Sequence, residues 1–240
     1  MSAQVAGRSF KRSDGLGRVL LGLLAVGILV DVVNILITFL EIQTLQRLRR
    51  GEASPQEAVE AIDRSGAVGI VVAVIFVGTI VIWLVWQHRG QANLHALAIP
   101  GLTFSPAWAV GWWLIPVVNL WKPFQAVREL WKASGGDEAW WRIATWPVIG
   151  WWWACWIVFN ILYNATVRFW SSDSASLDML IAGDGFSIAG DLVSIVGAIL
   201  AIAIVRAVNA RQAGLVHVVA ARTRVPTRPD LPSGGVHQNP

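Results

Sequence analysis

Four apolar stretches of about 20 residues limit what this chain can fold into. A helix needs roughly 20 apolar residues to cross the hydrocarbon core of a bilayer, and only helices and closed barrels satisfy their own backbone there. Charged residues make up 14% of the chain, against about 25% in soluble domains. We therefore predict an all-α, polytopic transmembrane helical bundle with full spans at residues 19–40, 67–86, 145–163 and 187–205.

A fifth apolar segment, residues 106–121, is shorter and interrupted. Ser105 suits a helix N-cap and Pro106 the first helical position, whereas Pro116 removes a backbone hydrogen bond inside the segment. Sixteen helical residues span about 24 Å, less than the roughly 30 Å hydrocarbon core. We predict a kinked, tryptophan-rich helix that is re-entrant or crossing, and its shortness favours re-entry. Its structural motif comprises Ser105, Pro106, Trp112, Trp113, Pro116, Trp121 and Pro123.

The distribution of lysine and arginine predicts the orientation, because cytoplasmic loops carry an excess of both. If residues 106–121 do not cross, both termini share one side with 14 of the 19 basic residues; if they cross, the split is 13 to six. We expect a cytoplasmic C-terminus and N-terminus, with a basic tail at residues 1–18 and a membrane domain at residues 19–206. Residues 207–240 are expected to be basic and then disordered.

The central box of the chain, "FSPAWAVGWWLIPVVNLWKPFQAVRELWKAS" (residues 104–134), resembles a bacterial multi-pass membrane family, domain of unknown function four-three-two-eight. Upstream, Trp86, Arg89 and Asn93 are similar to a W-x-x-R-x-x-x-N pattern of that family. The resemblance covers roughly residues 15–212 and implies a bacterial inner-membrane protein. Relatives carry cytosolic-looking N-terminal extensions, which implies a cytoplasmic N-terminus. The family supplies no activity.

Polar residues inside the predicted spans are functional candidates, because charge is costly in lipid. Asp31 is followed by Asn34, Thr38 and Glu41 at i+3, i+7 and i+10, so they share one helix face. The last span repeats this spacing with Asp184, Ser187, Asp191 and Ser194. These stripes either line a proton or cation path through Asp31 and Asp191, or bond neighbouring helices as structural contacts.

A second group of polar candidates surrounds the broken segment. Arg89 and Asn93 lie on one face just past the second span, and Asn119 follows Pro116 by one turn. We expect these three side chains to satisfy the backbone groups freed by the proline, with binding of a lipid phosphate as the alternative for Arg89 and Asn93. Fourteen of the fifteen tryptophans lie between residues 83 and 156, as expected of an aromatic belt at the membrane interface.

The sequence contains no recognisable catalytic motif, and we predict no catalytic residues, no metal site and no cofactor. The chain has one cysteine and no base-reading basic scaffold, so neither a cysteine-pair metal site nor nucleic-acid binding is expected. The expected partners are the bilayer, with anionic lipid at the basic tails, and a helix-packing protein. The favoured function is a non-enzymatic structural, interaction or regulatory component of the inner membrane. The alternatives are a small transporter or channel, and an intramembrane enzyme acting on lipids.

Overall fold

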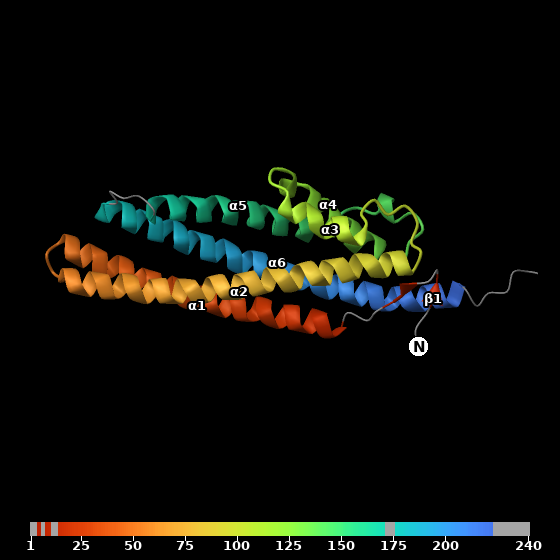
Figure 1. Ribbon diagram of the computed structural model, residues 1–240, viewed down its shortest axis with the longest axis horizontal. Coiled ribbons are helices and arrows are strands. Elements are labelled where there is room, and N and C mark those ends of the chain that lie inside the picture. Colours follow the sequence, from red (N-terminus) through yellow and green to blue (C-terminus); the bar gives the residue numbers. More distant parts are fainter. Residues whose placement is uncertain (1–3, 6–7, 11–13, 171–175, 223–240) are drawn as a thin grey trace, which may run out of the picture.

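The computed structural model describes residues 4–5, 8–10, 14–170 and 176–222, and four long helices set its architecture (Figure 1). All four are long and apolar enough to cross a membrane. The shortest has 24 residues, which is about 36 Å of helix. The predicted all-α polytopic bundle is therefore confirmed, and its long helices are α1 (Asp14–Arg49), α2 (Pro55–Ala96), α5 (Pro147–Trp170) and α6 (Leu177–Arg222).

The long helices form two antiparallel hairpins, α1–α2 and α5–α6, which pack together mainly through α1 and α6. The first hairpin turns at Gly51, and Ser54 then caps α2 in a reciprocal capping box with Glu57. The Arg49 guanidinium donates to Asp178 Oδ1 at 2.6 Å, so the end of α1 meets the start of α6. We call this the turn end of the bundle.

The opposite end carries residues 97–146, which we call the cap. Its elements are α3 (Pro106–Gly111), η1 (Trp112–Leu114), η2 (Val118–Leu120), α4 (Lys122–Ala133) and η3 (Trp140–Arg142). Helix α2 ends at the cap end and α5 begins there, so the chain enters and leaves the cap on the same side (Figure 1). The Trp-rich segment therefore turns back to the end of the bundle at which it starts, and we call it the re-entrant segment in this geometric sense.

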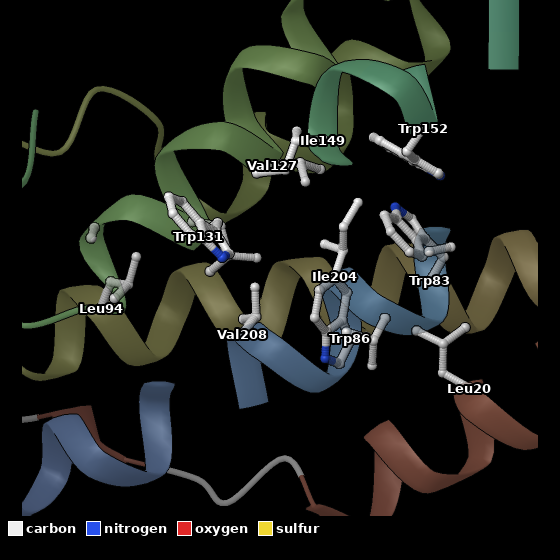
Figure 2. Packing of buried hydrophobic residues seen from close by; sticks show 14 of the residues in the cluster. Leu20, Trp83, Trp86, Leu94, Val127, Trp131, Ile149, Trp152, Ile204 and Val208 are labelled. Carbon is white, nitrogen blue, oxygen red and sulfur yellow. The ribbon is translucent and has the colours of Figure 1, made fainter. Parts of the chain in front are cut away.

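The main apolar core lies where the cap meets the bundle. Figure 2 shows Trp83 and Trp86 of α2 and Trp152 of α5 filling the space beside Ile204 of α6. The rings of Trp83 and Trp152 stack with centroids 5.0 Å apart. Val127 and Leu130 of α4 are fully buried in the same cluster. Because α2, α4, α5 and α6 share one core, the cap is an integral part of the bundle.

The chain ends differ from the predicted tails in extent. Residues 14–18 of the predicted N-terminal tail already belong to α1, and a short antiparallel pair, β1 (Gln4–Val5) and β2 (Arg8–Ser9), precedes it. Of the predicted tail at residues 207–240, residues 207–222 continue α6. The disorder predicted beyond them concerns residues outside those that the structure describes.

Candidate functional site

The re-entrant segment begins and breaks where the sequence indicates. The Ser105 hydroxyl accepts a hydrogen bond from Trp108 N at 3.3 Å, which caps α3 directly before Pro106. The helix then tightens into η1 and opens at Pro116. Val117 has φ +67° and ψ −53°, and Val118 N donates to Pro116 O at 2.8 Å. This is a γ-turn of the rare, strained type, adopted here by a β-branched residue.

Gln87 of α2 holds α3 and η1 against the bundle. Its side-chain amide donates to Ala109 O at 2.9 Å, and its oxygen accepts from the indoles of Trp83 and Trp113, both at 3.1 Å. We call residues 114–117, where the segment turns, the tip. After the tip, Trp153 of α5 donates to Leu120 O at 3.0 Å. Side chains from α2 and α5 therefore satisfy backbone carbonyls on both arms of the segment.

Glu129 of α4 organises the entry to the segment from inside the protein. Its carboxylate accepts hydrogen bonds from Thr103 N at 2.8 Å, Phe104 N at 3.1 Å and Gln91 Nε2 at 2.6 Å, and the residue is only 5% exposed. Gln91 also donates to Phe104 O at 2.9 Å. A buried carboxylate is tolerated when several donors surround it, and here the donors come from α2 and from the chain leading into α3.

The structure distributes the predicted residues around the cap in different ways. Asn93 donates to Gln212 Oε1 at 3.1 Å and so links α2 to α6. Arg89 and Asn119 are half-buried, and among the described residues neither side chain hydrogen-bonds the broken segment. Gln87, Gln91 and Glu129, which sequence reasoning missed, make those contacts. The available signal was the spacing of Trp83, Gln87 and Gln91 by one helical turn.

The remaining predicted motif residues surround the tip. Trp112 lies beside Trp108 with ring centroids 4.7 Å apart, and Trp113 contacts three tryptophans of α5. Trp121 is exposed, and Pro123 is buried in the first turn of α4. The motif therefore forms one unit, in which some tryptophans pack inward and others face outward.

A second polar feature lies between α1 and α6, at the middle of the bundle and towards the turn end. Asn34 Nδ2 donates to Asp191 Oδ2 at 2.8 Å, and Ser194 is the hydrogen-bonding neighbour of Asp31. The antiparallel register that these pairs define also sets Glu41 opposite Asp184. We call this set the polar ladder: Asp31, Asn34, Thr38 and Glu41 of α1 with Asp184, Ser187, Asp191 and Ser194 of α6.

The polar ladder is enclosed by protein and extends over only part of the bundle. Asp31, Asn34 and Asp191 are each 7% exposed and Asp184 is 1% exposed. The ten steps from Asp31 to Glu41 correspond to about 15 Å of helix. At its outer end Ser65 of α2 donates to Glu41. Next to the ladder on the cap side, α1 and α6 contribute apolar side chains to the core, among them Leu20, Leu24, Ala201 and Ile204.

We expect Asn34 and Asp191 to be energetically coupled. In a double-mutant cycle with Asn34→Ala and Asp191→Ala, the coupling free energy should be about 0.6–1.7 kcal/mol, the range for hydrogen bonds between membrane helices. The measurement is reversible unfolding in mixed micelles. A parallel cycle with Asn34→Ala and Ser187→Ala tests a pair that is offset by one turn in the same ladder and should give less. Equal coupling in both cycles would contradict the pairing of Asn34 with Asp191.

The described residues contain no group of three or more histidine, cysteine, aspartate or glutamate side chains that could hold a metal ion. The four ladder carboxyls lie in two pairs along α1 and α6 and do not converge on one point. A further buried polar contact links α2, α4 and α6, where the Gln212 amide donates to Gly90 O at 2.9 Å and to Ser134 Oγ at 3.3 Å.

These features define the class of protein: a polytopic helical membrane protein with a re-entrant cap and a buried polar helix interface. The model of the DUF4328 family, a domain of unknown function, matches residues 49–210, and the chain belongs to this family. The resemblance drawn from residues 104–134 is thereby confirmed. The match includes the cap and the α6 half of the polar ladder, whereas Asp31 and Asn34 precede it. No curated protein and no solved structure matches the chain.

Proposed function

We propose that this protein is a non-enzymatic interaction or regulatory component of the bacterial inner membrane, with the cap on the cytoplasmic side. The observation that carries the proposal is the construction of the cap. Buried hydrogen bonds of Gln87, Gln91 and Glu129 fix its inner face. Aromatic and basic side chains on its outer face take no part in these hydrogen bonds. A rigid outer surface of this kind suits recognition at the membrane.

Charge supports the proposed orientation. With the cap re-entrant, both termini belong to the cap end, and the basic residues divide 14 to five in favour of that end. By the positive-inside rule, this excess supports a cytoplasmic cap end. The five at the turn end are Arg47, Arg49, Arg50, Arg64 and Arg168.

The tip of the cap supports its contact with lipid. Leu114 is 78% exposed and Val117 is 66% exposed, although neither is near a chain end. Trp108 and Trp121 are also exposed on the same segment. Exposed apolar side chains beside tryptophan are typical of a segment that sits in the interfacial region of a bilayer.

Site-specific photocrosslinking in cells tests the proposed interaction role. A photoreactive residue replaces Ala144, which is exposed on the cap, or Val74, which is exposed in the middle of α2. We expect a defined protein adduct from position 144 and lipid adducts alone from position 74. The proposed orientation has a separate test. A cysteine introduced at position 2 should react with a thiol reagent only when that reagent crosses the membrane and reaches the cytoplasm. Turnover of a lipid by the purified protein, abolished by one side-chain change, would contradict the proposal.

The polar ladder supports a second candidate, a cation or proton path through Asp31 and Asp191. The favouring observation is that Asp31, Glu41, Asp184 and Asp191 are buried together, and no basic side chain pairs with any of them in the described ranges. Such groupings mark ion paths in membrane proteins. The apolar packing of Leu20, Leu24 and Ile204 between the ladder and the cap weighs against a continuous path.

Ion flux in proteoliposomes distinguishes the two candidates. The proposed interaction role predicts no proton or monovalent-cation flux above that of empty liposomes for the unaltered chain. If flux is present and Asp31→Asn abolishes it, while Asp63→Asn at an exposed position of α2 leaves it intact, the second candidate replaces the first. Both variants need the same helical content and the same yield of monodisperse protein.

A further inference from the structure

The cap holds a small open cavity along α4, and its lining includes Thr103, Phe104 and Glu129 beside basic and aromatic side chains. Its volume is about 220 Å³, below the roughly 300–1,000 Å³ of pockets that enclose drug-sized ligands. The cavity therefore suits a compact polar group and not a whole lipid. Helix α4 lines one wall with Gln125, Arg128 and Lys132, and the segments at Thr103 and Trp141 contribute to the rest.

The charges in this cavity are unbalanced. Arg49 and Arg50 at the turn end each pair with a carboxylate, at 2.6 and 2.9 Å. Arg128 and Lys132 have no such partner among the residues that the structure describes, and the Arg128 guanidinium lies over the Phe124 ring, 5.7 Å from its centroid. Partial burial and then the neighbouring Arg128 charge lower the pKa of Lys132. A bound anion would relieve this repulsion.

The one carboxylate that lines the cavity, Glu129, forms no ion pair with these cations, and two cations against this one carboxylate leave the lining with a net positive charge. Its two oxygens are occupied by Thr103 N, Phe104 N and Gln91 Nε2 on the inner side of α4. Trp140 also lines the cavity, but its indole N–H donates to Pro100 O at 2.9 Å and is therefore not available to a ligand. Arg128, Lys132, the Gln125 amide and the exposed Trp141 ring are left to contact a ligand.

We propose that this cavity binds a phosphate-bearing anion through Arg128 and Lys132. The arginine fork matches two phosphate oxygens, lysine contributes a third charged donor, and the Trp141 ring packs on the group that carries the phosphate. A phospholipid headgroup and a small soluble phosphate ester share this chemistry. The lipid source rests on the proposed position of the cap at the bilayer surface, whereas the phosphate site itself does not.

Competition binding tests the site. The detergent-purified full chain is titrated with fluorescent phosphatidylglycerol, and unlabelled phosphatidylglycerol, phosphatidylcholine or glycerol 3-phosphate serves as competitor. Arg128→Gln with Lys132→Gln should weaken binding about tenfold or more. The matched control, Arg142→Gln with Arg206→Gln, removes the same charge from two exposed positions outside the cavity and should change affinity less than twofold. Thermal unfolding of each variant reports whether the fold is intact.

The competitors identify the source of the phosphate. Displacement by phosphatidylglycerol but not by glycerol 3-phosphate supports a lipid headgroup, and displacement by both at similar concentrations supports a soluble ester. Equal loss of binding in the two double variants would overturn the proposal, because the attraction would then follow net charge alone. Absence of displacement by any competitor would also overturn it. Neither result bears on whether position 144, outside the cavity, crosslinks to a protein, so this site and the proposed function can fail separately.

Discussion

Glu129→Ala is expected to lower the free energy of unfolding by about 3–5 kcal/mol, because several donors lose their acceptor together. Phe104 N and one N–H of the Gln91 amide stay buried without that acceptor, and the part-buried Thr103 N also loses it. Each unsatisfied buried donor costs about 1–3 kcal/mol. The entry to α3 depends on these three bonds, so the loss should begin in the cap.

Two further variants serve as comparisons for Glu129→Ala. Glu129→Gln keeps one acceptor oxygen but turns an NH₂ group towards a donor, and it should cost about half as much. Glu60→Ala removes an exposed carboxylate from the turn end of α2 and should stay within about 0.5 kcal/mol of the unaltered protein. Unfolding in mixed micelles gives the free energies, and hydrogen exchange at Thr103 and Phe104 reports the cap directly. An Ala variant as stable as the Glu60 control would contradict the role given to Glu129.

Gln87→Leu is expected to destabilise the protein by about 2–4 kcal/mol and to loosen α3 from α2. Leucine fills a similar volume but leaves Ala109 O and the indole N–H groups of Trp83 and Trp113 without a partner, and each such group carries a desolvation cost. The matched control is His88→Leu, the next residue on α2 and exposed. Because it adds the same side chain without breaking a buried contact, it should be nearly neutral.

Labelling at the tip separates local loosening from global unfolding for Gln87. A cysteine at position 114, in a chain whose Cys155 is replaced by alanine, is already exposed and reports the mobility of the tip through a spin label. Gln87→Leu should increase that mobility under conditions where the helical signal is unchanged, and His88→Leu should not. A tip that stays as rigid in Gln87→Leu as in the control would show that Trp153 and the apolar core hold the segment without Gln87.

The spans and the break at Pro116 could be predicted because each depends on local properties. Length and apolar content decide whether a helix suits a bilayer, and proline removes its own hydrogen bond wherever it occurs. The path of residues 106–121 could not be decided in the same way, because the charge splits of 14 to five and 13 to six are nearly equal. The end of the bundle at which this segment begins and ends depends on how α2, α4 and α5 pack together in the folded protein.

The partners of the broken segment were missed for a different reason. Asn119 and Arg89 are close to it in sequence, but the residues that bond its carbonyls and entry amides are Gln87, Gln91 and Glu129. A glutamine past the end of an apolar span is expected to face water, and only the return of the chain over α2 makes it a buried residue. The face shared by Asp31 and Asn34 was predictable from helical spacing, whereas its register against α6 was not.

The register between α1 and α6 also fixes how far the two hairpins are shifted relative to each other along the bundle axis. Apolar side chains contact lipid tails and each other about equally well, so apolar faces alone hold neighbouring helices weakly at any one height. If α6 slid past α1 by three residues, Asp31 would face Asp191 and Asn34 would face Ile188. Such a slip would break the hydrogen bonds between α1 and α6 and would therefore cost free energy. The polar side chains between these two helices thus fix the position of the α5–α6 hairpin along the axis of the α1–α2 hairpin.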